Sequence, residues 1–251
     1  MRLTAGKKSA GTLKVLIVGY YGFENAGDEA ILRAIVIDLR ERHARIGVTV
    51  VSGDPARTRA SHGVAAISWH DCLAIFDAVA EADLTIIGGG GLFHDYWGFN
   101  PNLLFTSGQS GIAFYTAPAI LAALLDKPLM LYAIGVGPLF SEHAKRFVRV
   151  ACEAATAITV RDEGSKRLLE SLGVSGERVL VTADPALGLA LEEHCIVQAR
   201  ANNADAKKPL VAVSVREWSE GVQSNFWEGE FAAGLDRFLA KEGGTVLFAP
   251  F

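Results

Sequence analysis

The chain has 251 residues, half of them hydrophobic, which is enough apolar material for one domain core and part of a second. Its formal net charge of −4 excludes the strongly basic surface that nucleic-acid-binding proteins present, so we expect no nucleic-acid partner. Three scattered cysteines, Cys72, Cys152 and Cys195, form no CxxC pair and no disulfide framework, which favours a cytoplasmic location.

The chain begins with a polar, basic segment and contains one long uncharged stretch. Residues 1–12 lack the apolar region of a signal peptide, and we predict a flexible tail there. Residues 96–125 carry no charge, but Pro101, Gly111 and Pro118 interrupt them, so no run reaches the ~18 apolar residues of a membrane span. We predict instead a buried helix near residues 111–125.

Short apolar, β-branched runs alternate with helical patterns through most of the chain. The runs predict strands at residues 14–19, 47–52, 84–87, 129–134, 157–160 and 179–182. The helical patterns cover residues 28–43, 72–81, 112–125, 141–155 and 163–172. Continuous apolar strands alternating with helices are typical of an α/β fold, in which helices cover both faces of a parallel sheet.

A change in composition divides the chain into two predicted domains. We expect a first domain at residues 13–195, a polar linker at 196–208, and the beginning of a second domain at 209–251. The second domain should contain a strand at 210–216, a helix at 226–241 and a strand at 245–249. One strand–helix–strand unit cannot bury both faces of its sheet, so we expect this second domain to be incomplete.

Ligands of open parallel sheets bind outside the carboxyl ends of the strands, and the first such end is rich in polar residues. Gly22 and Gly27 have the glycine spacing of a P-loop, but Asp28 stands where its lysine would be, which excludes a phosphate loop. Asn25 is a predicted helix N-cap. Asp28 has two readings: it completes that cap, or it accepts a hydrogen bond from a sugar hydroxyl and acts as general base.

Four consecutive glycines, among them Gly89 and Gly90, follow the third strand and allow a close approach of the backbone to a ligand. The segment after them is dense in aromatic and polar side chains, including His94, Asp95, Tyr96 and Trp97. Aromatic faces beside polar groups suit a sugar, which has apolar C–H faces and polar edges. The alternative is a core cluster under the loop, with His94 in a structural role.

Arg161 follows the strand at 157–160 and opens the next helix, a position from which a guanidinium can clamp a carboxylate or phosphate. The alternative is a salt bridge with its neighbours Asp162 or Glu163. Asp184, at the next strand end, either caps the following segment or orients Arg161.

These strand ends resemble the polysaccharide pyruvyl transferase family. The motifs occur in the family's order, span about residues 14–190 and lie at residues 19–30 (GYYGFENAGDEA), 88–95 (GGGGLFHD), 134–138 (IGVGP), 160–162 (VRD) and 182–185 (TADP). The resemblance implies a GT-B-like architecture, in which two Rossmann-like domains face a cleft. It also implies a reaction in which pyruvate from phosphoenolpyruvate forms a ketal with two hydroxyls of a sugar, releasing phosphate.

The resemblance also implies roles for individual residues. Arg161 matches an arginine that holds phosphoenolpyruvate, and Asp28 matches an acidic position linked to activity. We add Asp95 as a second candidate carboxylate and expect the substrates to contact Asn25, Gly22, Gly89, Gly90, His94, Tyr96 and Trp97. No metal-ligand spacing stands out, so we predict no metal and no cofactor besides the donor phosphoenolpyruvate. No residue qualifies as the general acid.

Enzymes of this family act on the precursors of cell-wall polysaccharides, capsular polysaccharides or exopolysaccharides, and these precursors are often lipid-linked. The resemblance therefore implies a saccharide acceptor and work at the inner face of the membrane through peripheral association. Further donor-binding groups of the family lie in the second domain beyond residue 251, so we expect this chain alone to be catalytically silent. Two alternatives remain open: a GT-B glycosyltransferase that uses a nucleotide sugar, and a non-catalytic sugar-binding module.

Overall fold

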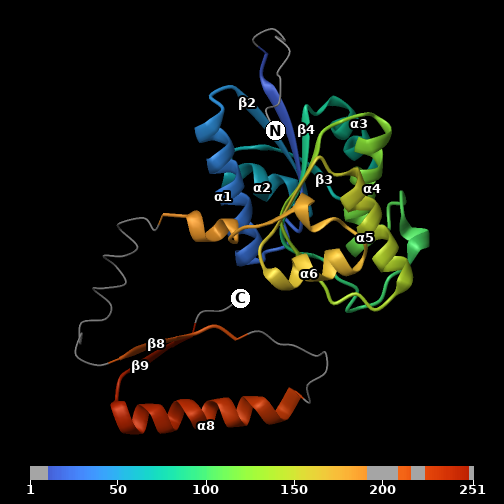
Figure 1. The fold of residues 1–251 in the computed structure, drawn as a ribbon. Helices are drawn as coiled ribbons and strands as arrows, with labels where there is room; N and C mark the ends of the chain where they lie inside the picture. Colours follow the sequence, from blue (N-terminus) through green and yellow to red (C-terminus); the bar gives the residue numbers. More distant parts are fainter. Residues whose placement is uncertain (1–10, 191–208, 216–223, 249–251) are drawn as a thin grey trace. The chain divides into compact units, whose positions relative to one another are not determined.

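Figure 1 presents the computed structural model of the chain, which describes residues 11–190, 209–215 and 224–248. The chain divides into two compact units, residues 1–189 and residues 190–251. Most of the predicted tail and all of the predicted linker at 196–208 lie outside the described residues.

The first unit is built on a parallel sheet of seven strands in the order β3-β2-β1-β4-β5-β6-β7. Its strands are β1 Leu13–Val18, β2 Ile46–Ser52, β3 Ala65–Ser68, β4 Leu84–Phe93, β5 Leu129–Val136, β6 Ala157–Val160 and β7 Val179–Val181. The strand order reverses between β1 and β4, which makes the carboxyl ends of these two strands the topological switch point where such sheets bind ligands. The predicted α/β fold is confirmed.

Helices cover both faces of this sheet (Figure 1). They are α1 Ala26–Arg42, α2 Pro55–His62, α3 Cys72–Glu81, α4 Gly111–Leu124, α5 Glu142–Ala154 and α6 Glu163–Ser171, with short 3-10 turns η1 Pro101–Leu103, η2 Gly176–Arg178 and η3 Pro185–Gly188. Alternate residues of β1 enter opposite core clusters, because successive side chains of a strand point to opposite faces. Ile17 packs in the cluster that contains Ile31 of α1, and Leu16 in the cluster that contains Phe114 of α4.

The structure corrects two sequence predictions in the centre of the sheet. The strand predicted at 84–87 continues through the glycines to Phe93, and the strand predicted at 129–134 continues to Val136. Glycines weaken a strand in isolation, but here β4 pairs with β5 along its length, with an irregularity between Gly91 and Phe93. The glycines therefore form the last part of the strand rather than a loop after it.

Two elements have no counterpart in the predictions. Helix α2 is short and polar, and β3 is a four-residue edge strand with only partly buried side chains. Neither carries the apolar periodicity from which helices and strands are recognised. Pairing with β2 decides β3, whereas local signals bound α2: Asp54 is its N-cap, Pro55 lies in its first turn and Gly63 is a left-handed C-cap.

The predicted buried helix in the uncharged stretch is confirmed as α4, nine of whose fourteen residues are buried. Among the described helices, none combines the length and the apolar character that crossing a bilayer requires.

The second unit contains strand β8 Leu210–Val213, helix α8 Ser224–Glu242 and strand β9 Thr245–Phe248. The two strands pair in parallel, as a strand–helix–strand unit requires. Val213 is the one buried hydrophobic residue among the described residues of this unit.

Candidate active site at the sheet switch point

Tyr21 fastens the loop after β1 to the neighbouring strand β4. Its ring is fully buried, and its hydroxyl donates a hydrogen bond to the carbonyl oxygen of Gly88. Burial, reinforced by the negative charge of Asp28, raises the pKa of the Tyr21 hydroxyl, which therefore stays protonated as a donor. The loop before α1 is thus held at the switch point.

Asn25 starts α1 as the sequence predicts. Its side-chain oxygen accepts hydrogen bonds from the backbone N–H groups of Gly27 and Asp28, at 3.0 and 3.1 Å. This N-cap uses the backbone of Asp28, and the side-chain oxygen of Asn25 supplies it.

The Asp28 carboxylate lies against the glycines of β4. A Cβ atom built on Gly90 would stand 2.6 Å from Oδ1 of Asp28, and Gly90 has a φ of +82°. Both the close approach and the left-handed backbone require glycine at this position. The half-buried carboxylate is thereby placed beside the carboxyl end of the central strand.

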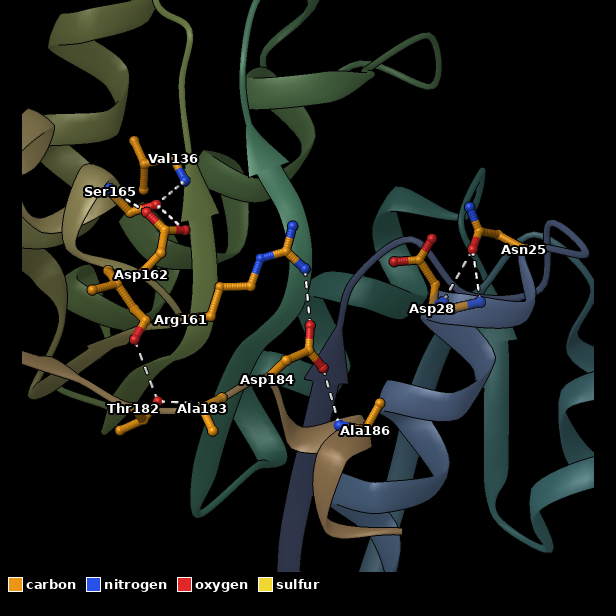
Figure 2. A network of polar contacts seen from close by, with 12 residues as sticks. Asn25, Asp28, Val136, Arg161, Asp162, Ser165, Thr182, Ala183, Asp184 and Ala186 are labelled. Carbon is orange, nitrogen blue, oxygen red and sulfur yellow. Dashed lines mark hydrogen bonds and ion pairs between the residues drawn. The ribbon is translucent and has the colours of Figure 1, made fainter. Parts of the chain in front are cut away.

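Arg161 reaches the same end of β4 from the other side (Figure 2). A Cβ atom on Gly91 would lie 3.8 Å from a terminal guanidinium nitrogen, and one on Gly135 of β5 would lie 3.3 Å from Nε. A side chain at Gly135 would therefore crowd the guanidinium, whereas one at Gly91 would meet it at ordinary contact distance. Because Asp28 and Arg161 approach the consecutive residues Gly90 and Gly91, a carboxylate and a guanidinium flank one short segment of strand.

Asp184 orients the arginine. Nη1 of Arg161 donates to Oδ2 of Asp184 at 3.0 Å, while Oδ1 of Asp184 accepts from the backbone N–H of Ala186 at 3.0 Å (Figure 2). Asp184 therefore performs both roles that the sequence left open. The Arg161 side chain remains 34% exposed, which leaves part of the guanidinium accessible to a ligand.

The sequence alternative of a salt bridge between Arg161 and Asp162 or Glu163 is wrong, because Arg161 forms its ion pair with Asp184. Asp162 caps α6 instead, accepting hydrogen bonds from the backbone N–H of Ser165 at 2.7 Å and from its hydroxyl at 3.0 Å. The Ser165 hydroxyl oxygen in turn accepts from the N–H of Val136. Helix capping occupies the adjacent carboxylate, and the arginine finds its partner 23 residues further along the chain.

A family model described as polysaccharide pyruvyl transferase matches residues 25–251, nearly the whole chain. The chain belongs to the polysaccharide pyruvyl transferase family. No curated protein matches it in sequence.

Solved structures resemble this pyruvyl transferase family member in fold. UDP-GlcNAc 2-epimerase from Neisseria meningitidis bound to UDP-GlcNAc has 15% identity and a TM-score of 0.54, covering 95% of this chain and 66% of its own. The Methanocaldococcus jannaschii 2-epimerase has 10% identity and a TM-score of 0.56, covering 94% and 65%. Anabaena Alr3699/HepE in complex with UDP has 13% identity and a TM-score of 0.53, covering 94% and 69%.

These likenesses show the GT-B-like fold that the sequence predicts. At such low identity they show nothing more. The chain spans about two thirds of the length of these structures.

The aromatic loop after β4, residues 94–99, lies at the same edge of the sheet. The His94 ring contacts Tyr96 and Trp97, with ring centroids 5.0 and 5.2 Å apart. Nδ1 of His94 is buried without a hydrogen-bond partner, and burial lowers the pKa of the imidazole, so His94 is neutral near pH 7. Trp97 is 69% exposed, which argues against the core-cluster alternative for this ring.

Asp95, which the sequence predicts as a catalytic carboxylate, has a structural role instead. The residue is 4% exposed, and its two carboxylate oxygens accept hydrogen bonds from the backbone N–H groups of Phe140 and Ser141, both at 2.8 Å. These bonds fasten the loop after β4 to the start of α5. Because both oxygens are engaged, we assign Asp95 to this structural role and give it no part in the proposed chemistry.

Two glycines of the predicted site are required by packing alone. A Cβ atom on Gly22 would stand 2.1 Å from Oγ of Ser52, and one on Gly89 would stand 2.0 Å from Cγ2 of Ile31. Both also have positive φ, at +80° and +73°. Their presence in the motif therefore needs no ligand to explain it, and their predicted substrate contacts stay predictions.

Sequence reasoning missed two polar groups at this site. Glu29 accepts a hydrogen bond from the N–H of Gly22 at 2.8 Å and pairs with Nε2 of His62 at 2.7 Å, which ties the loop to α2. Tyr115 is buried in α4, and burial followed by the negative charge of Asp28 raises the pKa of its hydroxyl. Sequence reasoning overlooked Tyr115 because the uncharged helix around it has the composition of a core helix. Glu29 could have been found, because it directly follows Asp28 in the same polar segment.

Within the described residues, no group of three histidine, cysteine, aspartate or glutamate side chains could hold a metal ion.

Proposed function

We propose that the full-length protein transfers pyruvate from phosphoenolpyruvate onto two hydroxyls of a sugar, forming a ketal and releasing phosphate. The observation that carries this proposal is the pair of Arg161 and Asp28 beside Gly90 and Gly91, at the switch point of a chain in this family.

The reaction requires three kinds of group. The vinyl carbon of phosphoenolpyruvate gains a proton and becomes a methyl group, and two sugar oxygens form bonds to the neighbouring carbon. The bond from that carbon to the phosphate oxygen breaks, and phosphate leaves. The two hydroxyl protons are balanced by the proton on the methyl group and the one carried away by phosphate. A base, an acid and cationic groups for the donor's two anions meet these needs.

Arg161 is the cation for the donor. Its guanidinium is held by Asp184 on one side and exposes part of its donor edge, so it can bind a carboxylate or phosphate through two parallel hydrogen bonds. Asp184 offsets some of the positive charge but fixes the orientation of the planar group, which is the condition for bidentate recognition.

Asp28 serves the acceptor. A carboxylate in the first turn of α1 repels an anion that would otherwise dock at the helix N-terminus, which keeps the donor's phosphate on the Arg161 side. The same carboxylate can take the proton of a sugar hydroxyl as general base. The acceptor we propose is a polysaccharide precursor, lipid-linked and reached at the inner face of the membrane.

The deciding experiment incubates purified full-length protein with phosphoenolpyruvate and a panel of lipid-linked and aryl sugar acceptors. We expect phosphate release that depends on the acceptor, together with a pyruvylated product seen by mass spectrometry. Release of nucleotide from UDP-sugars would instead support a glycosyltransferase, in keeping with the nucleotide-sugar enzymes of similar fold. Release of neither would support a non-catalytic sugar-binding protein.

A further inference from the structure

A stack of aromatic rings stands beside the switch point and has no part in the chemistry described above. The rings of Tyr20 and Phe23 are stacked, with centroids 4.4 Å apart and planes 15° apart. Trp69 packs edge-on against Phe23 at 4.9 Å and stacks on Phe114 at 4.0 Å. We name Tyr20, Phe23 and Trp69 the aromatic shelf.

Packing and a backbone hydrogen bond hold the rings of the aromatic shelf in place. Phe114 is fully buried in α4, and the backbone N–H of Trp69 donates to the carbonyl oxygen of Ser52 at 2.9 Å. The Phe23 ring fills the space beside Gly53, where a Cβ atom would stand 2.5 Å from it. The rings are therefore preorganised, and a ligand that stacks on them loses little free energy to ordering the protein.

The outer ring of the shelf faces solvent. Tyr20 is 40% exposed, whereas Phe23 and Trp69 are partly buried beneath it. Tyr20 follows β1 and Trp69 follows β3, so the shelf stands at the carboxyl edge of the sheet, where ligands of this fold bind. An accessible aromatic face on a rigid base at this edge is the feature that a sugar-binding subsite needs.

The shelf and Asp28 border the same part of the site. Tyr115 neighbours Phe114 in α4, with ring centroids 5.2 Å apart. Besides burial, the charge of Asp28 and then the nearby Tyr20 hydroxyl contribute to the raised pKa of Tyr115. Tyr20 and Asp28 also belong to one short segment, from the end of β1 to the first turn of α1, which the Tyr21 hydroxyl holds against Gly88 of β4.

We propose that the aromatic shelf is the acceptor subsite, on which the C–H face of a pyranose ring stacks against Tyr20 with its hydroxyls directed toward Asp28. The identity of this sugar as a pyruvyl acceptor rests on the proposed function. The stacking itself does not, because it depends only on the exposed ring, its rigid support and the neighbouring polar groups. The aromatic shelf, rather than the aromatic loop after β4 that contains Trp97, is then the principal sugar-binding aromatic surface.

The first test measures sugar binding without catalysis. Saturation-transfer NMR on the full-length protein uses the methyl glycosides of glucose, galactose, mannose and N-acetylglucosamine as probes. We expect at least one glycoside to receive saturation at its ring C–H protons. Tyr20→Ala should abolish this transfer, Tyr20→Phe should retain it because the ring remains, and Phe140→Ala, which removes another exposed aromatic ring, should leave it unchanged.

The second test measures turnover with the best acceptor of the phosphate-release assay. Tyr20→Ala should raise the acceptor KM about tenfold, the lower end of the range found when an aromatic ring that stacks on a nucleic-acid base is removed. The KM for phosphoenolpyruvate should stay unchanged. Circular dichroism and the recovery in Tyr20→Phe check that the loss is not one of folding.

Each outcome decides one of the two proposals. Three results overturn the proposed role of the shelf: the wild-type protein binds no glycoside, Tyr20→Ala still binds it, or only Trp97→Ala loses binding. Glycoside binding that depends on Tyr20 in a protein that transfers no pyruvate supports the shelf and overturns the proposed function instead.

Discussion

Arg161 has a fixed orientation and an accessible donor edge at the same time. Its Nη1 is fixed by Asp184, while the rest of the guanidinium lies over glycines that leave it room and partial exposure. The geometry therefore favours a group that is held ready for an anion.

Replacing Arg161 with alanine should weaken donor use strongly. Loss of a charge-assisted bidentate contact costs about 2–4 kcal/mol, seen as a higher KM for phosphoenolpyruvate, a lower kcat, or both. Arg161→Lys should retain only part of the donor use, because an ammonium group cannot form two parallel hydrogen bonds to one anion. Steady-state kinetics of the full-length protein in the phosphate-release assay measure this effect. Arg149→Ala, which removes an exposed arginine of α5, is the control. Wild-type kinetics in both Arg161 variants would exclude the role.

Replacing Asp28 with asparagine should separate catalysis from helix capping. Asn25 provides the cap and remains, so the variant should stay folded and still bind phosphoenolpyruvate. Turnover should fall about 100-fold or more, because the base is lost. Asp38→Asn on the same helix, where Asp38 pairs with Arg42, is the matched control. An Asp28→Asn protein that melts early but retains full specific activity in its folded fraction would mean that Asp28 is structural.

At the scale of the element, the end of β4 carries three consecutive glycines with different physical tasks. Gly89 makes room for Ile31, Gly90 makes room for Asp28, and Gly91 lies beside Arg161 with an ordinary van der Waals margin. Alanine substitutions should therefore produce three distinct results.

Gly89→Ala should cost stability, by about 2–5 kcal/mol, because it combines a left-handed backbone with a clash in the core. Gly90→Ala should cost about 1–2 kcal/mol for the backbone and should also lower activity, since the new methyl group displaces the Asp28 carboxylate. Gly91→Ala, without positive φ or clash, is the control for folding. Denaturant unfolding and phosphate-release kinetics on the same proteins measure both quantities. Equal effects at all three positions would contradict this division of tasks.

The link between the β1–α1 loop and α2 should make stability depend on pH. The hydrogen bond with His62 is the main reason why the pKa of the Glu29 carboxyl lies below its ordinary value. A lowered folded-state pKa contributes stability that is present above the unfolded-state pKa, near 4.5, and is lost as the pH falls through the folded-state value.

Glu29→Gln should therefore be less stable than the wild type at pH 7, and the difference should shrink as the pH falls below about 4.5. Unfolding free energies from denaturant titrations between pH 7 and pH 3 measure the effect, with exposed Glu41→Gln of α1 as the control. A difference that stays constant over this range would show that the Glu29 charge contributes nothing.

At the scale of the whole molecule, the burial of apolar side chains is concentrated in the first unit. Both core clusters consist of residues up to Ala186, whereas Leu247 and Phe248 of β9 are more than half exposed. Since burial of apolar surface is the dominant favourable term in folding, the first unit carries what it needs to fold.

A chain ending at residue 189 should accordingly fold by itself. We expect a cooperative denaturant transition by far-UV circular dichroism, with the signal of a mixed α/β protein. The 251-residue chain is the reference. A gradual transition, with strong binding of a dye that reports exposed apolar surface, would contradict this expectation.

The sequence by itself determined the parallel α/β architecture and the places where chemistry gathers. Apolar runs alternating with helical patterns depend only on neighbours along the chain, and so do the polar residues that follow each run. Asn25 as a helix cap and the positions of Asp28 and Arg161 at strand ends follow from such local signals. Their chemical roles stay predictions.

The tertiary structure alone decided which of these residues meet. Arg161 pairs with Asp184 rather than its neighbour Asp162, because the helix end takes the nearer carboxylate. Four glycines that read as a loop lie in a strand, since the pairing with β5 outweighs their weak strand preference. The aromatic shelf joins Tyr20, Phe23 and Trp69, whose spacing in sequence carries no common period. Strand order and register bring them together, and no pattern within one segment encodes either.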